Sequence, residues 1–134
     1  MPDELLRDPD PQVRNYARAR WGRENPARVA VLSDLLRQET DVVAISSMVK
    51  TLGDSGDRAA VPVLIEMTRH ADAFVRQDAA RALGKLRDRR AIPALSALLA
   101  DHTQPYRLTE SGSMSNVHTV AQVARAALDE IQGP

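Results

Sequence analysis

The chain has 134 residues, of which 43% are hydrophobic and 27% are charged, a balance typical of one globular domain. Eighteen basic residues are matched by eighteen acidic ones, so the chain lacks the positive surplus with which nucleic-acid-binding proteins neutralise phosphates. Cysteine is absent, which excludes disulfides, thiolate metal sites and cysteine nucleophiles.

The first residues, MPDELLRDPDP, contain no apolar core of the kind that a signal peptide needs. Within them, PDELLRD predicts either a short helix that covers the first repeat or a frayed tail. No apolar run in the sequence approaches the roughly 18 residues of a membrane span. We therefore expect a soluble, cytoplasmic protein.

An internal repeat organises most of the sequence. The segment from Asp72 to Asp101 matches the preceding segment at a spacing of 31 residues, and it matches the one before that in its first half. A period of this length is typical of stacked helix pairs, which bury their apolar faces against neighbouring units. We expect one domain over residues 1–134, with units at about 8–40, 41–71 and 72–101, an insertion at 102–116 and a partial unit at 117–132.

Each unit is predicted to form a helix, a turn and a second helix. In the third unit Asp72 is a candidate N-cap, and Gly84 lies where it would loosen or end the first helix. Pro93 suits the first turns of the second helix, where its missing N–H costs least. The predicted core residues recur at spacings of three and four: Val75, Ala79, Ala82, Leu83 and Leu86, then Ile92, Leu95, Leu98 and Leu99.

The last predicted helix, VAQVARAALDEI from Val120 to Ile131, matches the first helix of a unit, and no second helix follows it. Its unpaired face suggests that it docks on a second copy of the chain or on a larger protein. The insertion before it, HTQPYRLTESGSMSNVH, predicts a solvated surface loop, a segment that grips a ligand or partner, or a lid over the open apolar end of the last helix.

The repeat resembles a known family. The residues that carry the resemblance are VRQDAARALGKLRDRRAIPALSALL, echoed in VRNYARARWG and in SSMVKTLGDSGDRAAVPVLIEM. They are similar to the HEAT repeat, more closely to its short bacterial variety, the phycobilisome-lyase-type HEAT-like repeat. The resemblance implies an all-α fold, a right-handed α-solenoid of about 3.5 HEAT-like helix pairs whose second helices line the concave side.

HEAT-like repeats serve many roles as binding surfaces, so the fold leaves the function open. We expect a non-catalytic protein–protein interaction module: an adaptor, assembly factor or regulatory subunit. The protein partner would lie on the concave second helices, on the insertion, or on both. The residues expected to contact it are Asp34, Arg37, Val63, Glu66, His70, Ala94, Ala97, Asp101, Tyr106 and Arg107.

Two alternatives follow from the same resemblance. Some relatives attach or remove bilin chromophores, but a large planar tetrapyrrole favours an aromatic-lined pocket and this chain has only one Trp, two Tyr and one Phe. Other HEAT-like proteins are DNA glycosylases that cradle duplex DNA on basic residues. Arginines cluster in the first and third units here, although we expect them to pair with nearby acids or to lie on solvated faces.

Catalytic and metal-binding patterns are weak in this sequence. Glu66 and His70 are four residues apart on one helix face, but two ligands do not make a metal site. Deoxyhypusine hydroxylase, a HEAT-like enzyme, holds iron with repeated His-Glu dipeptides, and this chain contains none. No nucleophile elbow, phosphate loop or paired carboxylates occur. We therefore expect no catalytic residues, no metal and no cofactor.

Overall fold

The computed structural model describes residues 3–24, 28–105 and 118–133, and every regular element within them is helical. The predicted all-α class is confirmed. No helix in this described part of the chain is long and apolar enough to cross a membrane. The elements in chain order are η1 (Asp3–Arg7), α1 (Pro11–Glu24), α2 (Arg28–Gln38), α3 (Val42–Asp54), η2 (Arg58–Ala60), α4 (Val61–Met67), α5 (Ala73–Leu86), η3 (Arg89–Ala91), α6 (Ile92–Ala97), η4 (Leu98–Ala100) and α7 (Val120–Gln132).

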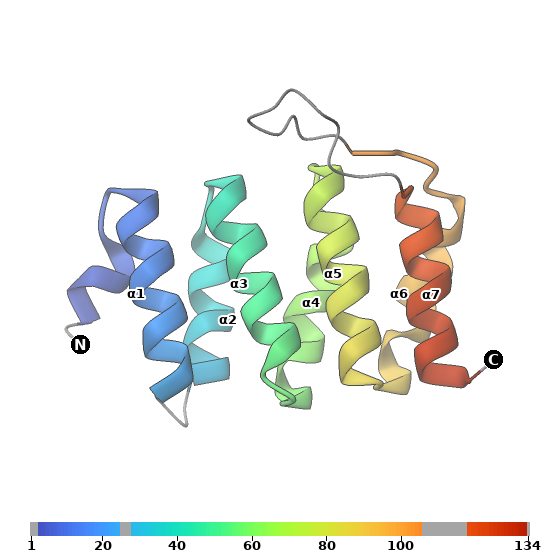
Figure 1. The fold of residues 1–134 in the computed structure, drawn as a ribbon, viewed down its shortest axis with the longest axis horizontal. Coiled ribbons are helices and arrows are strands. Elements are labelled where there is room, and N and C mark those ends of the chain that lie inside the picture. The colour runs from blue at the N-terminus through green and yellow to red at the C-terminus, as the bar shows by residue number, and fades with distance from the viewer. Residues whose placement is uncertain (1–2, 25–27, 106–117, 134) are drawn as a thin grey trace.

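The helices form two layers (Figure 1). In the first layer α1, α3, α5 and α7 stand side by side, and in the second layer α2, α4 and α6 lie behind them. The two termini lie at opposite ends of the long axis, so the chain advances one helix pair at a time. This is the predicted α-solenoid. The short 3-10 helix η1 covers the α1 end, where its Leu6 is buried, in agreement with the short-helix alternative for this segment.

Aspartates begin the helices as predicted. The Asp72 carboxylate accepts a hydrogen bond from the N–H of Phe74 at 2.8 Å, which satisfies a free donor in the first turn of α5. Asp41 does the same for α3. Pro93 lies in the first turn of α6, where its ring costs no helical hydrogen bond. The local sequence thus sets where each helix starts.

The predicted apolar stripes form the core. All five stripe residues of α5 are buried, and Leu95 of α6 is fully enclosed. Leu98 is also buried, whereas Ile92 and Leu99 are half-buried at the margin of the core. Because the core residues of successive helices contact one another along the whole array, each repeat depends on its neighbours for burial.

Glycines at the seams between first-layer helices have a role that the sequence interpretation missed. A Cβ atom at Gly84 would lie 2.9 Å from both Cα and Cβ of Ala127 in α7. At Gly53, one repeat earlier, a Cβ would lie 2.7 Å from Cβ of Ala82 in α5. Gly84 therefore does not end α5, as predicted, but permits close helix contact. The helix ends instead at Arg87, whose backbone is left-handed with φ of 52°.

An arginine clamp closes the first and third repeats. Arg14 Nε donates to Oε1 of Glu39 at 2.8 Å, and Arg76 Nε donates to Oδ2 of Asp101 at 2.7 Å. Each guanidinium also donates to two backbone carbonyls just before its own helix. One side chain thus joins the start of the first-layer helix, the preceding turn and the end of the second-layer segment.

The second repeat lacks this clamp. At the equivalent positions it has Ile45, which is buried, and His70, whose Nδ1 accepts the Asp72 N–H at 3.0 Å. An apolar contact and a neutral hydrogen bond therefore replace the ion pair.

Candidate functional site: a groove between α5 and α7

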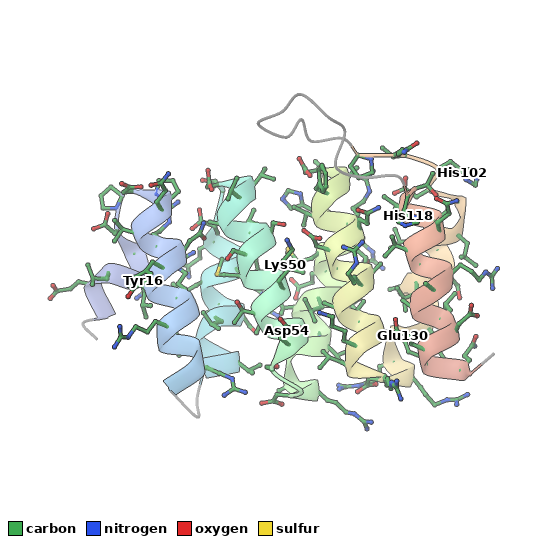
Figure 2. The ribbon with its side chains drawn as sticks, in the orientation of Figure 1. Tyr16, Lys50, Asp54, His102, His118 and Glu130 are labelled. Atoms are coloured by element: carbon green, nitrogen blue, oxygen red, sulfur yellow. The ribbon has the colours of Figure 1, made fainter. Side chains whose placement is uncertain are left out.

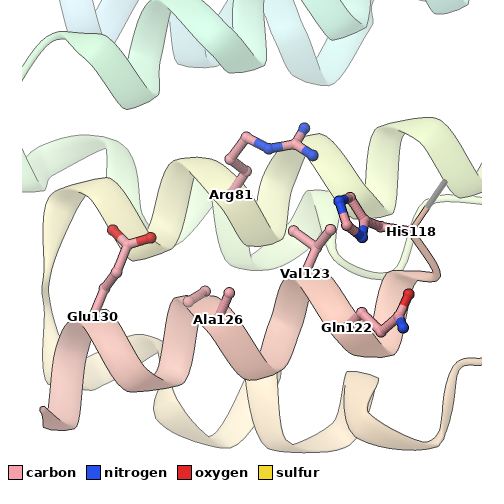
Figure 3. Close-up of a pocket in the computed structure, with 7 residues that line it drawn as sticks. Arg81, His118, Gln122, Val123, Ala126 and Glu130 are labelled. Atoms are coloured by element: carbon pink, nitrogen blue, oxygen red, sulfur yellow. The ribbon is translucent and has the colours of Figure 1, made fainter. Parts of the chain in front are cut away.

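A groove of about 270 Å³ lies where α5 and α7 meet (Figure 3). His118 lies at one end of it and Glu130 at the other, with Val123 and Ala126 of α7 between them and Arg81 of α5 opposite these two. Its lining combines one side chain of α5, one residue just before α7 and one face of α7: Arg81, His118, Gln122, Val123, Ala126, Ala127 and Glu130.

Hydrogen bonds fix the segment that carries His118. Gln77 of α5 is buried, and its Nε2 donates to the backbone oxygen of His118 at 3.0 Å. The next residue, Thr119, forms a capping box with Gln122: its hydroxyl accepts the Gln122 N–H at 3.1 Å, and the Gln122 side chain accepts the Thr119 N–H at 2.8 Å. The Gln77 bond therefore joins this segment to α5, and the capping box fixes the start of α7 itself.

One nitrogen of the Arg81 guanidinium, Nη1, is hydrogen-bonded to Asp78, and the other N–H donors remain available. The buried Asp78 accepts a hydrogen bond from the hydroxyl of Ser46 in α3 and another from Arg81 Nη1 at 3.3 Å. This is the only hydrogen bond recorded for the Arg81 guanidinium within the described residues, and its side chain is 45% exposed. A guanidinium has five N–H donors, so Arg81 can bind an incoming acceptor without leaving Asp78.

Glu130 supplies the opposite charge. Glu130 lies on α7 (Figure 2), and among the described residues it makes no ion pair. Lys85, at the equivalent position of α5, is paired with Asp54 of α3 at 2.7 Å. The groove thus has a cationic side chain on its α5 wall, apolar side chains in its middle and an anionic side chain at one end. Such a site suits an elongated ligand that carries both a carboxylate and N–H donors.

Within the part of the chain that the structure describes, no three His, Asp or Glu side chains group to hold a metal ion.

The residues predicted to form the concave ridge do not form one site. Arg37 and Glu66 join α2 to α4 through an ion pair of 2.7 Å, and Asp34 lies 3.5 Å from Arg37. Val63 was expected at the surface but is fully buried. The physical reason is that α4 buries a wider face than the predicted stripe, so that Val63 joins Val61 and Leu64 in the core.

Two further predicted residues are occupied by structural contacts. Asp101 belongs to the clamp with Arg76, and His70 accepts a backbone hydrogen bond at the start of α5. Their polar atoms are therefore largely engaged. Tyr106 and Arg107, predicted on the insertion, lie outside the described residues.

Ala94 and Ala97 line a second, smaller hollow of about 230 Å³ between α4 and α6. Arg69 and Arg90 border it, and Arg90 is held by Asp88 at 2.8 Å. The predicted small residues thus come together, but in a hollow distinct from the groove.

Sequence reasoning missed Arg81, His118 and Glu130 as a group. When α7 is aligned with α5, as its apolar stripe requires, Glu130 falls on Lys85. This reversal of charge at one position of the repeat was the signal in the sequence. His118 lies in no repeat position, so no comparable signal existed for it.

Comparisons with known proteins agree with the fold. The family model for HEAT repeats matches residues 29–113. The chain is 55% identical over 51 residues to phycocyanobilin lyase subunit alpha from Picosynechococcus sp.. It also matches a chain in the solved structure of the complex of CpcE and CpcF of phycocyanin lyase from Nostoc sp. PCC7120, with a TM-score of 0.74 and 29% identity.

The matched regions differ in extent. The similarity to phycocyanobilin lyase subunit alpha covers 38% of this chain and 19% of that protein. The structural match covers 96% of this chain and 51% of the Nostoc chain. The chain thus spans about half of the solved relative and about a fifth of the curated one.

These relatives correct two expectations drawn from the sequence. Both are lyase proteins, so the expectation of a non-catalytic interaction module, and of a chain with no enzymatic role, is wrong. The HEAT-repeat model covers more than half of the sequence, and the Nostoc chain shares the fold. The chain belongs to the HEAT-repeat family and is similar to phycobilisome-lyase-type members of it.

Proposed function

We propose that the chain is part of a bilin lyase-type enzyme, in which it holds a linear tetrapyrrole while the chromophore is transferred. The observation that carries this proposal is the 55% identity over 51 residues to phycocyanobilin lyase subunit alpha. The match to the phycocyanin lyase complex, at 29% identity over 96% of this chain, supports it. Fold alone would be insufficient, because HEAT-like repeats serve several functions.

The groove between α5 and α7 has the chemistry that such a ligand requires. An open-chain tetrapyrrole carries carboxylates, pyrrole N–H groups and apolar ring edges. Arg81 can bind a carboxylate through two parallel hydrogen bonds, Glu130 can accept from N–H groups, and Val123 can contact a ring face. A volume of about 270 Å³ lies just below the usual range of roughly 300–1,000 Å³ for small-molecule sites. We infer that the groove holds one end of the chromophore.

The binding is non-covalent in this proposal. The sequence contains no cysteine, so this chain has no thiol that could retain a bilin through a thioether. Weak, reversible contacts suit a protein that must release its ligand. The role of this chain would therefore be to hold and orient the chromophore rather than to carry it permanently.

A protein partner forms part of the proposal. One relative is named as a subunit and the other is a chain in a complex of two proteins. We propose that this chain acts with a second lyase-type subunit. Light scattering of the chain alone and mixed with such a subunit would test this, and an unchanged monomer mass in both samples would contradict it.

The chromophore proposal is tested by titrating the purified chain with phycocyanobilin and recording the visible absorption spectrum. We expect a red-shifted or intensified band that saturates, because a bound tetrapyrrole is held in fewer conformations. Arg81→Gln should weaken binding by roughly tenfold, the typical cost of one charge-assisted hydrogen bond. The matched control is Arg89→Gln, which removes an exposed arginine that does not line the groove and should leave binding unchanged.

A flat titration with the chain alone and with the second subunit would contradict the lyase-type proposal. Equal weakening by both substitutions would instead show that the chromophore binds elsewhere than in the groove.

A further inference from the structure

The first repeat has a second arginine, Arg18, beside the arginine clamp of Arg14 and Glu39. In the third repeat one arginine, Arg76, pairs with one acid, and the position that corresponds to Arg18 is a fully buried Ala80. In the first repeat Arg18 joins Arg14 on the single carboxylate of Glu39, with Nη1 of Arg18 at 2.7 Å from Oε1. Arg18 is only 4% exposed.

The charges of this cluster do not balance. Burial acts against ionisation of Glu39, but hydrogen bonds from the Asp41 N–H, from both arginines and from the Thr40 N–H hold its pKa at about 2. Glu39 is therefore ionised at neutral pH, and two nearly buried guanidinium groups face one carboxylate. Buried charge is costly unless it is paired, so the excess positive charge requires an explanation.

A pocket of about 290 Å³ opens beside the cluster, between η1, α1 and the end of α2. Arg18 Nε donates to the backbone oxygen of Leu6 at 2.7 Å and its Nη1 to Glu39, whereas its Nη2 donates to no described residue. That Nη2 atom is not one of the fully enclosed unsatisfied polar atoms of the described chain. Arg7, exposed at the rim of the pocket, has no ion pair or side-chain hydrogen bond within the described residues.

The neighbouring acids are engaged elsewhere. The Asp8 carboxylate accepts the Asp10 N–H at 2.9 Å, and the Asp10 carboxylate accepts the Gln12 N–H at 2.9 Å. Both therefore stabilise the turn that leads into α1 and contribute no oxygen to the lining of the pocket. Free guanidinium donors thus face an open space that contains one acid, Glu39.

We propose that this pocket is an oxyanion-binding site that takes a single carboxylate or phosphate group. Arg18 Nη2 and the Arg7 guanidinium donate to the oxyanion, while Glu39 and the backbone oxygen of Leu6 hold Arg18 in place. Guanidinium groups suit both oxyanions because their donors match two acceptor oxygens at once. The inference is independent of the lyase-type proposal, since the pocket lies at the α1 end and the groove lies between α5 and α7.

The test is a titration of the intact chain with inorganic phosphate and, separately, with acetate, followed by NMR of the arginine Nε–H signals. We expect saturable shifts at Arg7 and Arg18. Arg7→Gln should weaken binding by roughly tenfold, and it should fold normally because Arg7 is exposed and unpaired. Arg89→Gln is the matched control, and it should bind as the unaltered chain does.

The two probes distinguish the sources of the ligand. Saturation by phosphate alone assigns the site to a phosphoryl group, and saturation by acetate assigns it to a carboxylate. The proposal is overturned if neither anion shifts these signals, if Arg7→Gln binds as tightly as the unaltered chain, or if Arg89 responds as strongly as Arg7.

Discussion

The second and third repeats share a 31-residue spacing, yet they are closed by different chemistry. The third repeat ends in the ion pair between Arg76 and Asp101, whereas the second has Ile45 and His70 at these positions. Both nevertheless bury a leucine completely at the equivalent position, Leu64 in the second repeat and Leu95 in the third. The comparison shows that the two repeats share their interior packing. The ion pair at the end of one repeat can be replaced by an apolar residue and a hydrogen bond in the other.

The ends of the first-layer helices differ in the same way. After α3 the left-handed residue is Gly56, with φ of 71°, and after α5 it is Arg87, with φ of 52°. Glycine adopts this conformation without strain, whereas a side chain makes it costly. The seam contacts, in contrast, are alike: Gly53 packs on Ala82 as Gly84 packs on Ala127.

The largest expected effect tests whether packing is truly common to both repeats. Leu64 and Leu95 occupy equivalent positions and are both fully buried. Leu64→Ala and Leu95→Ala should each lower the free energy of unfolding by about 2–5 kcal/mol, because each leaves a cavity in the core. Urea denaturation measures this. If either variant kept its full stability, the two repeats would not share one core.

A smaller effect tests the clamp that only one of the two repeats has. Burial acts to raise the pKa of Asp101, but hydrogen bonds from Arg76 and Thr103 hold it below its usual value of 3.8. Because the folded pKa is the lower one, the ionised carboxylate stabilises the fold above about pH 3.8 and loses this effect as pH falls through the folded pKa. Asp101→Asn should therefore cost about 1–3 kcal/mol at neutral pH and less in acid.

Urea denaturation at several pH values checks this, with Asp34→Asn as the control. Asp34 is largely exposed and lies 3.5 Å from Arg37, so its loss should cost at most about 1 kcal/mol. If the difference in free energy of unfolding between Asp101→Asn and the unaltered chain became larger toward acid pH, the expected pH dependence would be wrong.

The smallest effect concerns the helix ends. Arg87→Gly should raise the free energy of unfolding by about 1 kcal/mol, because it relieves a left-handed backbone. Gly56→Arg should lower it by a similar amount. Thermal melting of both variants measures the change, and Arg89→Gly serves as a control at a position without positive φ. Equal responses to glycine at residues 87 and 89 would show that backbone strain is not the cause.

Much of the fold could be predicted because it is encoded locally. Asp41 and Asp72 precede their helices by one residue, so their capping roles follow from short-range chemistry. The stripe that contains Leu83 is visible at helical spacing without knowledge of its neighbours. Gly84 was misinterpreted because a glycine near the end of a stripe can mean a helix end or a close contact, and only the position of Ala127 decides between them.

The candidate site was harder to predict because it depends on distant contacts. Gln77 and His118 are 41 residues apart and meet only after the chain has passed through the second layer and the insertion. Charge reversal at Glu130 was visible in the sequence, but its meaning depends on Lys85 being already paired with Asp54. Such competition between partners is a property of the assembled helices rather than of a local motif.

The contact between Gly84 and Ala127 also bears on how the groove could change during evolution. Ala127 is both the partner of Gly84 and part of the lining of the groove, so the absence of one carbon atom at residue 84 sets how closely α7 can approach α5. A methyl group at residue 84 would push α7 away from α5, and with it the residues of α7 that line the groove. A substitution at residue 84, which does not line the groove, can thus change the width of the groove while every lining side chain stays the same.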